Sequence, residues 1–74
     1  MKAPSNCQVA YEIIERHQPI TGLEFRHFAR TKGMERQLVK ALSHVSELGL
    51  IHRQPWLVAC SMSRLRARPW VVTP

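Results

Sequence analysis

The residues Met34–Leu48, MERQLVKALSHVSEL, followed by Gly49, decide the fold of this chain. An α-helix advances about 100° per residue, and at that spacing the apolar and polar residues of this stretch separate onto opposite sides. Gly49 can adopt a left-handed conformation past the last turn, which ends the helix and lets Leu50 fold back on Val45. We therefore predict a helix over about 34–48, with one side buried and the other free for solvent or a ligand. The buried side comprises Met34, Leu38, Ala41, Leu42, Val45 and Leu48, and the opposite side Arg36, Gln37, Lys40, Ser43, His44 and Glu47.

A first helix is predicted over about 6–17. Ser5 and Gln8 have the spacing of a capping box, in which each side chain bonds the backbone N–H of the other residue. Apolar residues then recur at the helical period. Pro19 ends this helix, because the residue before a proline favours an extended conformation.

A second, shorter helix is predicted over about 22–31. Thr21 and Glu24 have the spacing of another capping box, and the few apolar residues that follow give the helix a narrow buried stripe. Gly33 then turns the chain directly into the third helix. Two helices joined by so tight a turn must cross at a steep angle.

The chain past the third helix has the composition of β-strands. The segment 50–54 is bounded by Gly49 and Pro55, and the segments 56–60 and 69–72 contain enough β-branched or aromatic residues to be strands. Their pattern leaves two pairings open. The segment 50–54 either pairs with 56–60 as a tight hairpin or pairs with 68–72 across a long loop.

Arginines alternate along residues 63–68. In an extended chain this spacing places Arg64, Arg66 and Arg68 on one face and the apolar residues between them on the other. The parity of the apolar positions changes near Ser63, which indicates a turn or a bulge there. The run favours a surface that binds a polyanion, or a solvated edge strand that its charge protects from aggregation.

The composition is basic. Eleven Lys and Arg oppose five Glu, which gives a formal net charge of +6 in 74 residues. No acidic residue follows Glu47, so much of the excess lies in the C-terminal third. This balance favours a polyanionic partner such as nucleic acid, although positive charge that merely maintains solubility is the plain alternative. A chain of this length forms one domain, residues 1–74, around a single small core.

Several functional classes lack their sequence signals. No apolar run of about 18 residues is present, so we expect no membrane partner, and no signal-peptide pattern is visible, so we expect a cytoplasmic chain with reduced thiols. Cys7 and Cys60 lack metal-ligand spacing, and the four histidines match no compact zinc pattern. The glutamates have the positions of capping and surface groups. We therefore expect no enzyme, no metal and no cofactor.

The second and third helices carry the residue pattern of a helix-turn-helix. That pattern places an apolar and a small residue late in the first helix, and Phe28-Ala29 fit it. It continues with a glycine and an apolar residue, here Gly33-Met34, and with two apolar residues three apart, here Val39 and Leu42. The chain departs from the pattern at Lys32, where an apolar residue is more usual.

The remaining elements extend this likeness to about residues 6–73. The string Val45–Arg53, VSELGLIHR, resembles the end of the recognition helix and the start of the wing in MarR-like bacterial regulators, and Trp70–Thr73 resembles their closing strand. The chain thus resembles a winged helix-turn-helix domain of bacterial or phage regulator type. The implied fold is mainly α with a small β-hairpin (α+β): helices at about 6–17, 22–31 and 34–48, and a wing at about 50–73.

The resemblance implies double-stranded DNA as the partner, with the third helix in the major groove and the wing along the backbone or minor groove. Arg36 and Gln37 suit base edges, whereas Lys40 and His44 suit phosphate. Glu35 lies among the groove-facing positions and places a negative charge near them. The implied DNA-binding residues are Arg36, Gln37, Lys40, His44, Arg53, Arg64, Arg66 and Arg68.

Two partner classes follow. In the first, the chain is a monomer or weak homodimer that regulates transcription or assists phage-type replication or recombination, in the bacterial or phage-infected cytoplasm or nucleoid. In the second, the same fold is a protein-interaction module without DNA binding, which the acidic Glu35 and Glu47 favour. Trp56 and Trp70 are interpreted as packing residues, with stacking on single-stranded bases as a lesser alternative.

Overall fold

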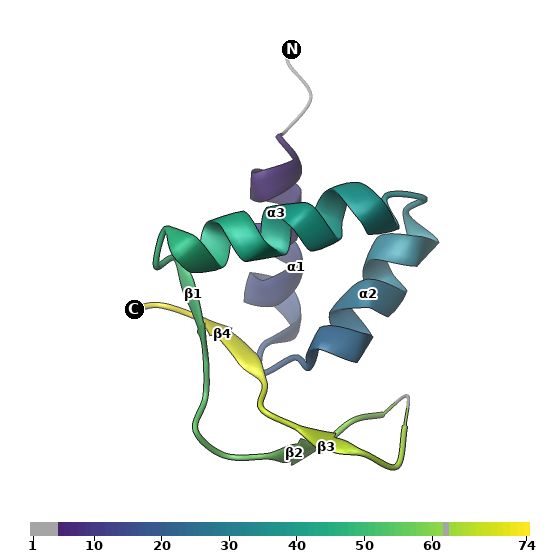
Figure 1. The fold of residues 1–74 in the computed structure, drawn as a ribbon, viewed down its shortest axis with the longest axis vertical. Coiled ribbons are helices and arrows are strands. Elements are labelled where there is room, and N and C mark those ends of the chain that lie inside the picture. The colour runs from purple at the N-terminus through teal and green to yellow at the C-terminus, as the bar shows by residue number, and fades with distance from the viewer. Residues whose placement is uncertain (1–4, 62) are drawn as a thin grey trace.

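Three helices followed by two short antiparallel strand pairs make up the fold (Figure 1). A computed structural model of the chain describes residues 5–61 and 63–74. The architecture is α+β, as predicted. The elements are α1 (Asn6–His17), α2 (Gly22–Thr31), α3 (Glu35–Glu47), β1 (Ile51–Arg53), β2 (Val58–Ala59), β3 (Arg66–Ala67) and β4 (Trp70–Val72).

The starts of α1 and α2 follow their capping residues. The Thr21 hydroxyl accepts a hydrogen bond from the Glu24 backbone N–H, and the Glu24 carboxylate accepts one from the Thr21 backbone N–H, so the capping box is complete. At α1 only half of the expected box forms: Ser5 accepts from the Gln8 backbone N–H, and among the residues that the structure describes no return bond joins the Gln8 side chain to the Ser5 backbone. Both helices occupy the predicted ranges.

Glycines end α2 and α3 in the same way. Gly33 has φ +70° and Gly49 has φ +76°, both in the left-handed region that a residue with a side chain rarely adopts. The backbone N–H of Leu50 donates to the Val45 carbonyl, and that of Gly49 to the Ser46 carbonyl, which is the hydrogen-bond pattern of a Schellman motif. The predicted stop of α3 is therefore present, one residue earlier than expected.

The strand pairing decides between the two alternatives left by the sequence. β1 pairs antiparallel with β4, with Ile51 opposite Val72 and Arg53 opposite Trp70. The 56–60 segment does not pair with β1. Only Val58–Ala59 of it is a strand, and it pairs with β3 near the far end of the loop. The long-range pairing is thus correct, and the expected five-residue strand over 56–60 is wrong.

β4 also pairs on its other side. Trp70 exchanges two backbone hydrogen bonds with Ile20, in the connector between α1 and α2. β4 therefore lies between Ile20 and β1, and it joins the connector between α1 and α2 to the ribbon strands.

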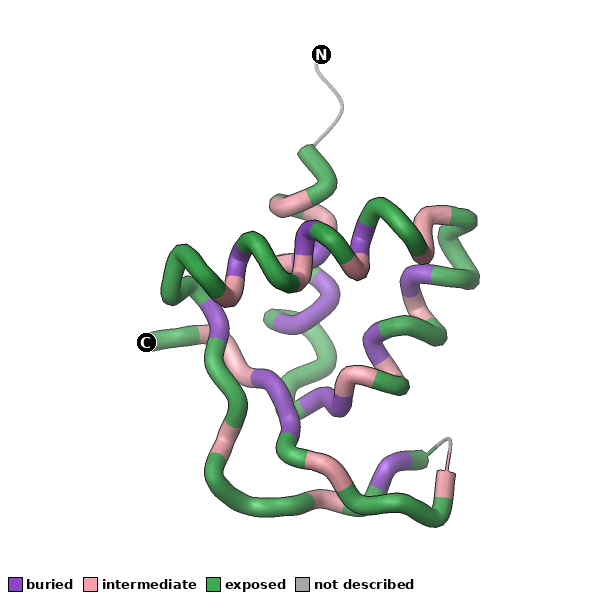
Figure 2. Tube along the Cα trace, viewed as in Figure 1, coloured by how far each residue is buried: buried purple, intermediate pink, exposed green. Residues whose placement is uncertain are grey.

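The core lies where α1, α2 and α3 meet β4 (Figure 2). Phe25, Ile14 and Leu38 are fully buried. Leu48, which the helical period assigned to the buried side, is 59% exposed because it caps the helix as the chain turns away. The whole buried cluster is Ala10, Ile13, Ile14, Ile20, Phe25, Ala29, Leu38, Ala41, Val45, Ile51 and Trp70.

We call residues 51–72 the ribbon. Its middle is fastened to the start of α2: Cys60 is buried with its Sγ 3.4 Å from the Thr21 hydroxyl, and the Ser61 hydroxyl donates to Glu24 over 2.6 Å. Trp70 packs in the core as expected, but Trp56 is 54% exposed, so its interpretation as a packing residue is wrong. The ribbon is held by a few directed contacts rather than by a core of its own.

Candidate functional site

The outer side of α3 presents four of the predicted residues. Arg36, Gln37, Lys40 and His44 are all exposed, while Leu38, Ala41 and Val45 face the core. The amphipathic pattern of this stretch predicted that division. No ion pair or hydrogen bond of these four side chains is present within residues 5–61 and 63–74, so their polar groups face solvent.

A shallow hollow joins α3 to α2. It is lined by Arg26 of α2 together with Arg36, Gln37 and Lys40 of α3. A neighbouring hollow extends to β1, because Arg26 and Arg53 line it together with Val39. Arg26 belongs to both hollows and makes them one continuous surface.

Arg53 is positioned by the core. Its guanidinium carbon lies 4.9 Å from the centroid of the Trp70 ring, within the range of a cation–π contact. Since Trp70 is held by β1 and by Ile20, this contact orients the guanidinium end of Arg53, and the residue stays exposed beside α2.

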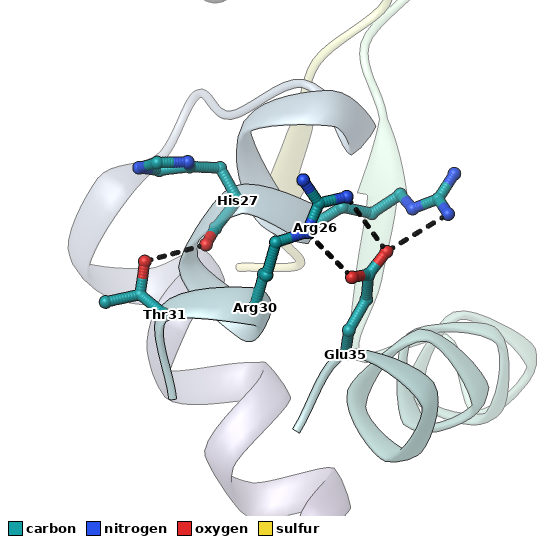
Figure 3. A network of polar contacts seen from close by, with 5 residues as sticks. All are labelled: Arg26, His27, Arg30, Thr31 and Glu35. Atoms are coloured by element: carbon teal, nitrogen blue, oxygen red, sulfur yellow. Dashed lines mark hydrogen bonds and ion pairs between the residues drawn. The ribbon is translucent and has the colours of Figure 1, made fainter. Parts of the chain in front are cut away.

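The start of α3 holds a charge cluster that the sequence did not reveal. Figure 3 shows Arg26 and Arg30 of α2 converging on the carboxylate of Glu35, the first residue of α3. Arg30 Nε lies 2.9 Å from Oε2 and Arg30 Nη2 3.3 Å from Oε1, while Arg26 Nη2 lies 3.2 Å from Oε1. The carboxylate of Glu35, whose negative charge is unfavourable for binding a polyanion, is therefore paired with two arginines.

Charge and hydrogen bonding keep this cluster ionised. The hydrogen bonds from Arg30 lower the pKa of Glu35, against a smaller opposing effect of burial, and pairing with Arg26 lowers it further. The same hydrogen bonds raise the pKa of Arg30. Glu35 is thus a carboxylate at neutral pH, and Arg30 keeps its positive charge.

We call the combined surface of α2, α3 and β1 the basic face. It carries five cationic side chains and one carboxylate. Met34 precedes α3 without a side-chain cap, so the first backbone N–H groups of the helix add partial positive charge there. Such a surface is chemically suited to a polyanion. Its members are Arg26, Arg30, Glu35, Arg36, Gln37, Lys40 and Arg53.

The other predicted arginines lie elsewhere. β3, which contains Arg66, is far from α3 in Figure 1, at the opposite end of the ribbon. Arg68 Nε donates to the Gln54 carbonyl over 2.7 Å and so closes the ribbon. The turn or bulge predicted near Ser63 is confirmed, because the chain bends at Ser63 and Arg64. Only Arg66–Ala67 of the run is a strand, so the arginine alternation does not continue along one extended chain over 63–68.

Arg26 and Arg30 are the residues that sequence reasoning missed. They are one helical turn apart on α2, and Glu35 follows five residues after Arg30, across the glycine turn. That spacing was a usable signal, since a tight turn between two helices brings the end of one close to the start of the next.

Residues 5–61 and 63–74 contain neither a metal-binding cluster nor a membrane-spanning helix. No three His, Cys, Asp or Glu side chains there are grouped to hold a metal ion. No helix in that part of the chain has both the length and the apolar character that crossing a bilayer requires.

Comparison of the chain with protein-family models, with curated proteins and with solved structures gave no match.

Proposed function

We propose that this chain is a winged helix-turn-helix domain that binds double-stranded DNA, as a regulator of transcription or as an accessory of phage-type replication or recombination. The observation that carries this proposal is the basic face, where cationic side chains of α2, α3 and β1 adjoin. In this proposal α3 enters the major groove and the ribbon acts as the wing.

The order of the elements supports the same reading. α2 and α3 are joined through Gly33 with a left-handed turn, as a helix-turn-helix requires, and α3 is followed by an antiparallel pair. Ile20 pairs with Trp70 through an isolated β-bridge on the side of β4 away from β1, and this pairing gives the ribbon a rigid base next to α3.

The roles within the basic face follow from side-chain chemistry. Arg36 and Gln37, in the first turn of α3, are suited to guanine and adenine edges. Lys40 and Arg53 are suited to phosphates on either side. His44 continues the exposed side of α3 one turn beyond Lys40 and is assigned to phosphate as well.

A salt titration tests the proposal. The chain is titrated against a labelled duplex, by fluorescence anisotropy, at several salt concentrations. We expect binding that weakens steeply with salt, and a log–log slope that falls by about one in Lys40→Ala, since one phosphate contact is lost. Arg36→Ala should relax sequence preference. No binding at low salt would rule the function out.

A set of arginine variants maps the surface. Arg53→Ala should weaken binding to all duplexes more than Arg66→Ala, because Arg53 belongs to the basic face and Arg66 to the far end of the ribbon. Arg16→Ala is the matched control, since Arg16 is exposed on α1 and lines none of the hollows of the basic face. An Arg16 effect equal to that of Arg53 would mean that only net charge matters.

A second candidate function is a protein-interaction module. It is favoured by large apolar side chains that the ribbon leaves exposed: Trp56 at 54%, Leu57 at 57% and Leu65 at 74%. Exposed apolar groups of this size mark interaction surfaces when they cluster. NMR shift mapping separates the two functions, because DNA should perturb Arg36 and Lys40, while a protein partner should perturb Trp56 and its neighbours.

A further inference from the structure

Glu35 occupies an unexpected place for a carboxylate. It is the first residue of α3, it lines the basic face, and its side chain keeps 29% of its exposure although two arginines bind it. The N-terminal residues of a recognition helix are those that reach base edges. On the proposed DNA-binding function, an acidic group therefore faces the nucleic acid.

The arginines that hold Glu35 keep free donors. A guanidinium has five N–H groups. Arg26 uses one for Glu35 and Arg30 uses two, so most remain available to a phosphate. Both side chains are largely exposed, at 56% and 71%. The cluster can thus contact a DNA backbone, but with one unit of its positive charge cancelled.

We propose that Glu35 sets the sequence selectivity of the basic face. It weakens binding to arbitrary duplexes by competing with phosphate for Arg26 and Arg30, and at preferred sites it accepts a hydrogen bond from the N4 amino group of a cytosine in the major groove. This inference rests on the proposed DNA binding.

The change in interface charge indicates how neutralising Glu35 should affect duplex binding. Neutralising Glu35 adds one effective positive charge to the interface, which steepens the salt slope by about 0.9 and strengthens nonspecific binding roughly eightfold at 0.1 M salt. Losing the ion pairs also frees the two arginines to move, but exposed pairs order side chains only weakly. The charge effect is therefore the larger one.

A carboxylate can select between bases because it cannot donate a hydrogen bond. It only accepts hydrogen bonds, so it is repelled by the acceptor atoms of guanine and thymine and can accept from the amino groups of cytosine and adenine. Cytosine is favoured of these two because adenine places its N7 acceptor beside the amino group. A glutamine at the same position would instead favour adenine, with which it can form two hydrogen bonds.

The experiment compares four proteins: the unchanged chain, Glu35→Gln, Glu35→Ala and the matched control Glu47→Gln. Glu47 is an exposed glutamate at the other end of α3, outside the hollows of the basic face, so its substitution makes the same change in net charge. Each protein selects sequences from a random duplex pool and is then titrated against unselected duplex at several salt concentrations. Far-UV circular dichroism verifies that each is folded.

We expect both Glu35 variants to bind unselected duplex about five- to tenfold more tightly at 0.1 M salt, with a slope steeper by about one. The cytosine preference of the unchanged chain should shift toward adenine in Glu35→Gln and vanish in Glu35→Ala, and Glu47→Gln should alter neither property. If Glu35→Gln and Glu47→Gln behave alike, the inference is overturned while DNA binding stands. If none of the four binds duplex at low salt, DNA binding itself is overturned, and the inference with it.

Discussion

The three helices and the ribbon are held together by different forces. α1, α2 and α3 supply most of the buried cluster, whereas the ribbon adds few buried residues and leaves Trp56, Leu57 and Leu65 exposed. The ribbon is fastened instead by short strand pairings and by hydrogen bonds of Ser61 and Arg68. The contrast teaches that most of the buried apolar contacts lie in the helices and at the two ends of the ribbon, Ile51 and Trp70, while the middle of the ribbon adds little to the core.

The largest expected effect is on the helical core. Phe25→Ala should lower the free energy of unfolding by about 3–5 kcal/mol, because the Phe25 side chain is fully buried where α2 meets α1 and α3. Urea unfolding followed by circular dichroism measures this. Leu65→Ala is the control and should change the value by less than about 0.5 kcal/mol, since Leu65 is 74% exposed. Equal losses of unfolding free energy in Phe25→Ala and Leu65→Ala would show that the helices are no more important for stability than the exposed part of the ribbon.

An intermediate effect is expected where the two regions meet. Thr21→Ala should cost about 1–2 kcal/mol, because it removes the cap of α2 and the hydroxyl next to Cys60. Ser5→Ala makes the same kind of change at the cap of α1, which is exposed and distant from the ribbon, and should cost about 0.5 kcal/mol. A smaller loss for Thr21 than for Ser5 would show that the ribbon gains nothing from this junction.

The smallest effect on global stability is expected for Ser61→Ala. It should cost less than about 1 kcal/mol, because it removes a single exposed hydrogen bond to Glu24. Hydrogen exchange should reveal it more clearly: the backbone N–H of Cys60, bonded to the Leu65 carbonyl, should exchange faster than in the unchanged chain. Unchanged exchange would mean that Ser61 does not fasten the ribbon.

The same variant should alter the response to acid. Burial raises the pKa of Glu24, but hydrogen bonds from Ser61 and Thr21 outweigh it and hold the pKa below its ordinary value of 4.5. A lowered pKa in the folded state stabilises the fold above about pH 4.5, and this contribution is lost as the pH falls further. Ser61→Ala should therefore lose less stability on acidification, as thermal melts between pH 3 and pH 6 would measure.

Local signals explain what the sequence predicted well. The capping residue Thr21 and the glycines at 33 and 49 each act within a few positions, so the helix bounds could be inferred without knowledge of the tertiary structure. The ribbon lacked such signals. Its strand β4 also pairs with Ile20, fifty residues before Trp70, and neither residue indicates the other in the sequence.

The candidate site divides in the same way. The exposed side of α3 follows from one helical period, so Arg36 and Lys40 were found. A helical wheel treats each helix separately, and therefore Arg26 and Arg30, which meet Glu35 only through the crossing of α2 with α3, were missed. Leu48 was misassigned for a related reason, because the period continues one residue beyond the point where the chain turns away.

The position of β4 has a consequence for biosynthesis. β4 is the last element of the described chain to be translated, yet it joins Ile20 on one side and β1 on the other. The helices can form as they leave the ribosome, but the arrangement around Trp70 must wait for the final strand. A chain cut anywhere before that strand would keep its helical periodicity and lose the strand that joins Ile20 to β1.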